Sequence, residues 1–214
     1  MRHPRSLRSQ SHVEAATGFT LVEVLVALLI MSILAVMGWR GVDSMVRARD
    51  TSQAAAERTL LLSALIGQWE QDLRAVQESA SVPPLAFDGQ SLRLTRRGDS
   101  GVQLVVWSLR DGAWWRWSSP PIARVTELQE AWMHSQQLQV GDPRALHLLD
   151  GVQGWQLYFY RGQGWSNAQS SGDVAAAPGA SASAPVRQQL PTGVRLVIDL
   201  PEGKLTRDVL MSTS

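Results

Sequence analysis

One carboxylate stands inside a long apolar stretch, and its position indicates a function more strongly than that of any other residue. Residues 19–37 contain Glu23 as their single charged side chain. A charged side chain at the centre of a membrane helix costs about 2.5–3.5 kcal/mol on insertion scales, so a carboxylate within such a stretch suggests a functional role. Glu23 lies near one end, where the cost is smaller. A carboxylate that is merely tolerated at the membrane interface is therefore the alternative interpretation.

Other residue types that could do chemistry show no pattern suited to catalysis or metal binding. The chain has no cysteine, and its four histidines lack a metal-ligand spacing such as His-Glu-x-x-His. The segment most similar to a nucleophile elbow, residues 164–168, ends in alanine and leads into a low-complexity stretch rather than a helix. We therefore expect no enzyme activity, no histidine-bound metal and no cofactor. Calcium binding stays undecided, because the loop carboxylates Asp142, Asp150 and Asp173 lack EF-hand spacing.

Tryptophans are concentrated in one short region, at positions 107, 114, 115 and 117. On a strand, Trp115 and Trp117 share one face, while Trp114 and Arg116 share the other. We interpret these rings as the core of a small domain, because aromatic side chains supply large buried areas. An exposed ring would more readily mark a subunit contact than a ligand site. The net charge of +1 gives no global attraction to nucleic acid.

The element that positions Glu23 is the apolar stretch itself. Its 19 residues, at about 1.5 Å per helical residue, are just long enough to cross a hydrocarbon core of about 30 Å. A secretory signal peptide carries its small-residue cleavage site after the apolar region, whereas Gly18 precedes this one. The sequence therefore predicts a membrane-spanning helix. Three arginines before it and three soon after it leave the orientation open on charge alone.

The junction resembles the N-terminus of type IV prepilin-like proteins, with Gly18, Phe19, Thr20 and Glu23 in the characteristic places after a basic leader. The resemblance implies that residues 1–18 are a leader, which a prepilin peptidase removes between Gly18 and Phe19 before the new amine is methylated. It also implies that residues 19–38 form an inner-membrane anchor and later a filament core, with the leader cytoplasmic and residues 39–214 periplasmic. Glu23 would then serve assembly, by pairing with the amine of Phe19.

The region beyond the anchor predicts an α+β domain, in which a long N-terminal helix packs on antiparallel β-sheet. No proline occurs between Gly18 and Pro83, and apolar residues recur at helical intervals from Leu62 to Val76, which predicts a helix that continues to about residue 77. The period then changes to two, as in strands, around residues 92–94, 102–106, 155–160, 194–200 and 205–211. Asp111-Gly112 is a strong hairpin signal.

Two segments resist this simple division. Residues 124–138 could form either a short helix or an irregular strand. Residues from about 167 to 187 are rich in Ala, Ser, Gly and Pro, with almost no apolar bulk. Such a composition cannot bury a core, so we expect a mobile loop there.

Short downstream segments also look like the J-type minor pseudopilin of type II secretion: residues 39–44, 149–152, 155, 158–160, 164–165 and 190–191. This resemblance implies a role in the pseudopilus tip complex, which initiates filament assembly and supports export of folded proteins across the outer membrane. The implied partners are the I-type and K-type minor pseudopilins, the major pseudopilin, the prepilin peptidase and the inner membrane, with no nucleic acid. The alternative is a minor pilin of a type IV pilus. The sequence names no exported substrate.

Overall fold

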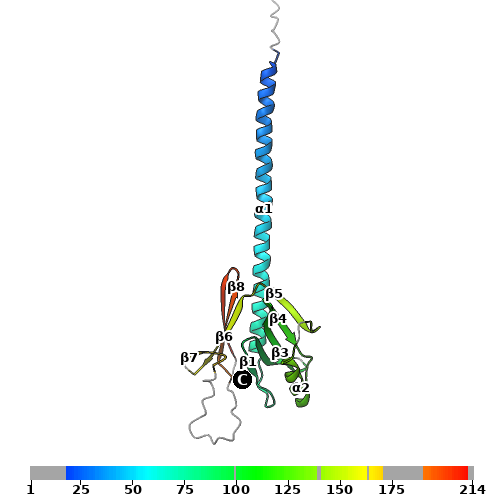
Figure 1. Ribbon diagram of the computed structural model, residues 1–214, viewed down its shortest axis with the longest axis vertical. Coiled ribbons are helices and arrows are strands. Elements are labelled where there is room, and N and C mark those ends of the chain that lie inside the picture. The colour runs from blue at the N-terminus through cyan, green and yellow to red at the C-terminus, as the bar shows by residue number, and fades with distance from the viewer. Residues whose placement is uncertain (1–17, 99, 139–140, 163, 171–189, 212–214) are drawn as a thin grey trace, which may run out of the picture. The chain divides into compact units, whose positions relative to one another are not determined.

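The computed structural model describes residues 18–98, 100–138, 141–162, 164–170 and 190–211. The chain divides into two units, residues 1–59 and 60–214, which are considered separately. Helix α1 (Leu21–Arg74) supplies the regular structure in the described part of the first unit and the opening turns of the second. The second unit adds two antiparallel sheets and helix α2 (Val125–Ser135). The expected α+β class, with a long N-terminal helix and antiparallel sheets, is confirmed (Figure 1).

The first sheet is a meander of five strands in the order β1-β2-β3-β4-β5. Its strands are β1 (Leu85–Phe87), β2 (Ser91–Gly98), β3 (Gly101–Arg110), β4 (Ala113–Ser118) and β5 (Ala145–Asp150). The second sheet has the order β7-β6-β8-β9. Its strands are β6 (Gly154–Arg161), β7 (Gly164–Asn167), β8 (Gly193–Leu200) and β9 (Gly203–Leu210).

The expected hairpin at Asp111-Gly112 joins β3 to β4. Asp111 has φ 51° and Gly112 has φ 72°, so both central residues adopt the left-handed region. A two-residue turn of this kind matches the right-handed twist of the paired strands, and Asp-Gly tolerates it well. Arg110 therefore pairs with Ala113, and the register of the whole hairpin follows.

Helix α1 ends three residues before the predicted end at residue 77. Ala75 N still donates to Gln71 O at 3.1 Å, and the backbone then joins β2, because Gln77 N donates to Thr95 O at 2.9 Å and Arg97 N donates to Ala75 O at 2.9 Å. The hydrogen bonds to β2 end the helix before the residue 77 that the apolar spacing predicted. Val76 still packs against the core.

The core of the second unit forms around Trp69 of α1. Its ring lies 5.3 Å from Trp107, 5.7 Å from Trp114 and 6.1 Å from Trp155, measured between centroids. These rings come from β3, β4 and β6, so the last turns of α1 pack against both sheets (Figure 1). The helical face predicted from Leu62 to Val76 supplies the contacts. The interpretation of most of the clustered tryptophans as core is thus confirmed.

A smaller cluster lies on the other face of the first sheet. Trp117 joins Leu104, Val106 and Ile122 there, beneath Leu128 of α2. Trp117 and Trp114 occupy opposite faces, as alternation predicted, and Trp115 is half-buried. The undecided segment 124–138 is therefore largely a helix, whose apolar side faces this sheet. Of the predicted mobile loop, residues 167–170 end β7 and form a turn, and residues 171–187 lie outside the described part.

Candidate functional site

The predicted processing junction lies immediately before α1. Gly18, Phe19 and Thr20 are non-helical and exposed, and Phe19 retains 86% of its accessible surface. Among the described residues, no atom beyond the two chain neighbours lies within 4 Å of the position that a Cβ on Gly18 would occupy. Within the described part of the chain, no residue covers the Gly18–Phe19 peptide bond. The predicted leader up to residue 17 lies outside the described residues.

Glu23 caps the first turn of α1, a role that the sequence reasoning did not consider. Its Oε2 accepts hydrogen bonds from the backbone N and the Oγ1 of Thr20, both at 3.0 Å. In return, Glu23 N donates to Thr20 Oγ1 at 3.3 Å. This reciprocal pair is a capping box, which satisfies backbone donors that a helix start leaves unpaired. The Thr-x-x-Glu spacing in the sequence was the available signal.

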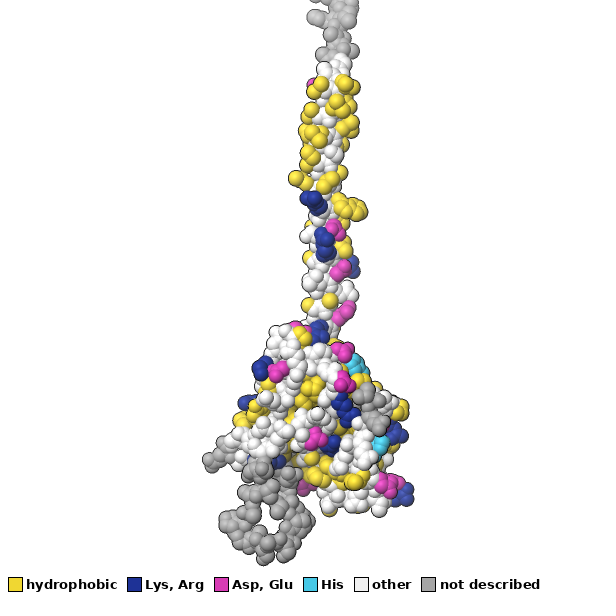
Figure 2. Space-filling view, viewed as in Figure 1, with side chains coloured by type: hydrophobic (Ala, Val, Ile, Leu, Met, Phe, Trp, Pro, Cys, Tyr) yellow, Lys and Arg dark blue, Asp and Glu magenta, His cyan; other side chains and the backbone are white. Residues whose placement is uncertain are grey.

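The part of α1 that follows Glu23 presents apolar side chains on all sides. Every residue from 21 to 50 is exposed, including the large side chains of the stretch up to Met37. Figure 2 shows these apolar groups along the N-terminal part of the helix. Within the described residues, α1 is the one helix long and apolar enough to cross a membrane by length and composition. A helix that is apolar on all sides needs lipid or neighbouring helices around it.

Neither the elbow-like segment nor the loop carboxylates form a catalytic or metal site within the described residues. Ser166 of the elbow-like segment lies within strand β7, whereas a nucleophile elbow needs a turn between strand and helix. Among the described residues, no group of three His, Asp or Glu side chains could hold a metal ion. Asp150 contacts His147 instead, with Nε2 and Oδ1 2.8 Å apart. Asp173 lies outside the described part.

Asp142 stabilises the loop that follows α2. The backbone N–H of Arg144 and the indole N–H of Trp117 both donate to its Oδ1, at 2.9 and 3.1 Å. The hydrogen bond from Arg144 and the contacts with His134 and Trp117 outweigh partial burial and hold the pKa of Asp142 below its ordinary value. This carboxylate therefore stabilises the conformation of the loop.

The strongest polar cluster of the second unit is one that the sequence reasoning missed. Asp72 of α1 is fully buried, and its Oδ2 accepts from Arg116 Nε at 2.8 Å and from Trp107 Nε1 at 2.9 Å. Its Oδ1 accepts from Arg116 Nη2 at 3.1 Å, from Gln68 Nε2 at 3.1 Å and from Arg96 Nη1. One carboxylate thus ties α1 to three strands of the first sheet. The available signal was its place three residues after Trp69, on the apolar face.

Glu70 makes the corresponding link to the second sheet. It pairs with Arg207 of β9 at 2.5 Å and with Arg74 of its own helix at 2.7 Å. Both arginines are more than half exposed, in contrast to the partners of Asp72. The two carboxylates position the last turns of α1 between the sheets, and only the Asp72 cluster is shielded from water.

Comparison with known proteins agrees with this geometry. The prokaryotic N-terminal methylation motif matches residues 15–39, which contain the open glycine junction, the capping box and most of the apolar helix. The chain therefore carries a prepilin-type N-terminus, and its apolar helix fits a membrane anchor.

The remainder of the chain identifies the family. Residues 40–211 match the family described as type II secretion system (T2SS), protein J, and this match covers most of the chain. The chain belongs to that family and is a J-type minor pseudopilin of type II secretion. The match favours this assignment over a minor pilin of a type IV pilus.

A solved structure is also similar. It is a chain of the GspK-GspI-GspJ complex from the type 2 secretion system of enterotoxigenic Escherichia coli, with a TM-score of 0.47 and 18% sequence identity. The similarity covers 73% of the present chain and 99% of that chain. A search of curated proteins gave no significant match.

Proposed function

We propose that the chain is cut between Gly18 and Phe19 by a prepilin peptidase, N-methylated, and then held in the inner membrane by residues 19–38. In this proposal the leader is cytoplasmic and residues 39–214 are periplasmic. The methylation motif over residues 15–39 supports this order of events. The exposed Gly18–Phe19 bond supports it as well, because a peptidase must reach the peptide that it cuts.

The mature chain acts as a structural subunit of the pseudopilus tip complex. It binds the I-type and K-type minor pseudopilins, initiates assembly of the filament with the major pseudopilin, and so supports export of folded proteins. The single observation that carries this proposal is the family match over residues 40–211. The role is non-catalytic, in keeping with the placement of Ser166 inside a strand.

The anchor and the second unit contribute to assembly in different ways. None of the described residues of the first unit, 18–59, is buried, so association with lipid or with other anchors provides the burial of its apolar side chains. The second unit has its own core around Trp69, which maintains the shape of a binding surface independently of the lipid. Assembly therefore proceeds by anchor packing in the membrane and by contacts of the folded unit in the periplasm.

Mass spectrometry of the purified chain tests the processing step. In cells with an active prepilin peptidase, the mature protein begins at Phe19 and carries one additional methyl group on its amine. Gly18→Lys, which places a long charged side chain at the junction, leaves the leader attached. A mature wild-type chain that retains residues 1–18 contradicts the proposal.

Co-purification tests the assembly step. The chain, solubilised in detergent, is expected to co-purify with tagged I-type and K-type pseudopilins. Minor pilins of a type IV pilus from the same cells serve as the competing partners. Retention of those pilins alone would favour the alternative role, although the leader would still be cleaved.

A further inference from the structure

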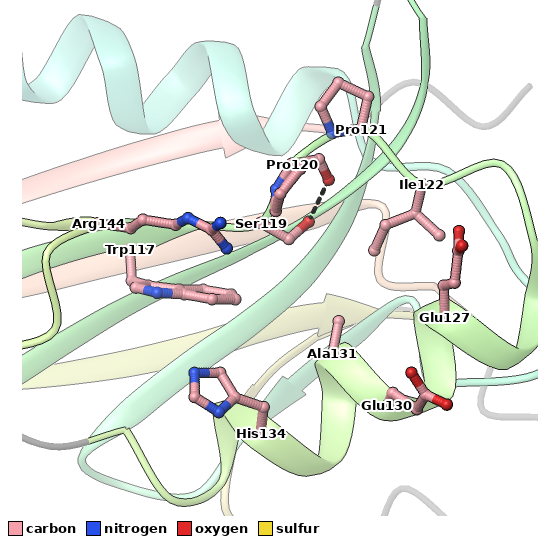
Figure 3. A pocket seen from close by; sticks show the side chains of 10 residues that line it. All are labelled: Trp117, Ser119, Pro120, Pro121, Ile122, Glu127, Glu130, Ala131, His134 and Arg144. Atoms are coloured by element: carbon pink, nitrogen blue, oxygen red, sulfur yellow. Dashed lines mark hydrogen bonds between the residues drawn. The ribbon is translucent and has the colours of Figure 1, made fainter.

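Two surface features of the second unit are open to another molecule: a pocket beside α2 and the outer edge of β9. The pocket, of about 430 Å³, lies where the loop after β4 meets α2, with Trp117 on its apolar side (Figure 3). Two of its charged residues already have partners, since His134 contacts Asp142 and Glu127 pairs with Arg124. The pocket therefore leaves its ligand unspecified, whereas a strand edge determines the backbone conformation of whatever binds to it.

The edge of β9 is the longest regular edge among the described strands. The other strands at sheet edges are β1, β5 and β7. β1 has three residues, β7 has four, and the register of β5 on β4 is interrupted between Trp114 and Trp115. β9, by contrast, pairs with β8 over all eight residues, Gly203–Leu210, without a register shift. Short strands, bulges and prolines are devices that prevent edge pairing, and β9 has none of them.

The hydrogen bonds of the hairpin indicate which backbone groups of β9 point outward. Met211 N donates to Thr192 O at 3.0 Å, just beyond the pair formed by Gly193 and Leu210. Hydrogen-bonded and non-hydrogen-bonded pairs alternate along antiparallel strands, so Leu210 and every second residue before it direct their N–H and C=O groups away from β8. These residues are Lys204, Thr206, Asp208 and Leu210. Within the described part of the chain, no backbone group of another element bonds to them.

The charges on β9 do not protect this edge, because each is paired inside the unit. Lys204 forms an ion pair with Asp199 of β8 at 3.0 Å. Asp208 accepts two hydrogen bonds from Arg195 of β8, both at 2.7 Å. The third charge, Arg207, pairs with α1. Unpaired charges at an edge oppose the approach of another strand, whereas these three are directed toward β8 and α1.

The side chains of β9 indicate what an added strand would contact. Val209 belongs to the core, and Leu205 is partly buried against it on the same face of the strand. Leu210 points to the opposite face and is 80% exposed. Side chains directly opposite each other on neighbouring strands interact. An added strand with apolar residues at alternate positions would therefore extend the core beyond Leu205 and Val209.

A second copy of β9 fits this edge poorly. An antiparallel copy that used all four outward residues would pair Lys204 with Leu210 and Thr206 with Asp208. Arg207 would then lie opposite Arg207 of the second copy. Like charges directly opposite each other on neighbouring strands are destabilising. The edge is therefore better suited to a segment of a different protein.

We propose that the outer edge of β9 binds an extended, uncharged segment of a partner protein as an additional antiparallel strand of the second sheet. The outward N–H and C=O groups between Lys204 and Leu210 bond to the main chain of the segment. Its apolar residues lie beside Leu205 and Val209. Strand addition of this kind takes its affinity from main-chain hydrogen bonds and its specificity from alternate side chains. The interaction is additional to the proposed role in the tip complex and does not depend on it.

Fluorescence polarisation with labelled peptides tests the proposal on the full-length chain in detergent. The probe is Lys-Thr-Val-Thr-Val-Thr-Val-Lys, whose end lysines serve solubility. The reference peptide has the same side chains but carries N-methyl groups on its four central residues, which removes main-chain donors. We expect the probe to bind at least tenfold more tightly than the reference. Equal binding of the two peptides would overturn the proposal.

Proline substitution at the edge provides the second arm. Thr206→Pro removes an outward N–H group that β8 does not use, and edge strands tolerate proline at such positions. It should weaken binding of the probe at least tenfold, whereas the matched control Thr206→Val keeps the N–H group and should stay within twofold. Leu210→Pro removes another outward donor and should also weaken binding.

Circular dichroism establishes that each variant is folded, and at least one of the two proline variants must be folded for the comparison. Unchanged binding of the probe by a folded proline variant would refute the assignment to β9. Sedimentation velocity of the wild-type chain tests the second copy as the alternative occupant. A dimer that Thr206→Pro dissociates would assign the edge to self-association and would overturn the proposal of a different partner.

Discussion

Removal of the Asp72 carboxylate should destabilise the second unit far more than removal of Glu70, two residues away on the same helix. Asp72→Ala leaves Arg96, Arg116 and the Trp107 indole N–H without their shared acceptor. The Arg side chains are only 17% and 13% exposed, so water replaces the lost contacts poorly. Breaking a buried ion pair by removing one partner typically costs about 3–5 kcal/mol. We expect about 3 kcal/mol, because both guanidinium groups keep some access to solvent.

Glu70→Ala is the matched control. Its partners Arg74 and Arg207 are 59% and 51% exposed, and such pairs contribute about 1 kcal/mol or less. The free energy of unfolding is measured by urea titration of the full chain in detergent, followed by tryptophan fluorescence, since Trp107 and Trp114 lie in the core. A total stability of about 5–15 kcal/mol makes the expected difference easy to resolve.

A third variant separates charge burial from packing. Replacing Asp72 with leucine together with Arg96→Met and Arg116→Met removes all the charges at once. Since apolar replacement of a complete buried ion cluster is often neutral or stabilising, this triple variant should regain most of the loss. An Asp72→Ala cost below about 1 kcal/mol, or one equal to that of Glu70→Ala, would refute the reasoning.

Three other outcomes are expected. Glu23→Ala should be cleaved normally but should enter the tip complex less efficiently. Glu23→Gln keeps a capping acceptor without the charge. Its entry into the tip complex should match that of Glu23→Ala if pairing with the new amine matters, and that of wild type if capping is the role of Glu23. Hydrogen bonds from Arg195 hold the pKa of Asp208 below its ordinary value. The stabilisation by these bonds is therefore present at neutral pH and is lost as the pH falls below about 4. The urea midpoint of Asp208→Asn should vary less with pH over that range than the midpoint of the wild-type chain. Gly101→Ala should lower the free energy of unfolding in urea by about 1–3 kcal/mol, because φ is 146° and a Cβ would lie 2.6 Å from a backbone oxygen. Gly67→Ala, which has open space on a helix, should be neutral or stabilising. A cost for Gly67→Ala equal to that for Gly101→Ala would contradict the backbone argument.

The sequence by itself determined the features that depend on neighbouring residues. The apolar stretch specified a long helix, because a continuous run of such side chains cannot be accommodated in a loop. Alternation predicted the main strands, and Asp111-Gly112 predicted the hairpin because only a few residue types accept two consecutive positive φ angles. The glycine junction and Glu23 were readable for the same reason, since the motif lies within six residues.

Tertiary structure decided the features that depend on residues far apart in the chain. Asp72 meets Arg96 and Arg116, which are 24 and 44 positions away; its place on the apolar face of the helix indicated burial, but no local pattern identifies the arginines that it contacts. The sequence also left the segment Val125–Ser135 undecided between a helix and an irregular strand. Its apolar side packs on a sheet built from earlier strands, and this packing is not visible in the local pattern. The pocket at Trp117 likewise exists only where that helix meets the loop after β4. Long-range packing, which determines which polar groups lose access to water, is the physical reason for the difference.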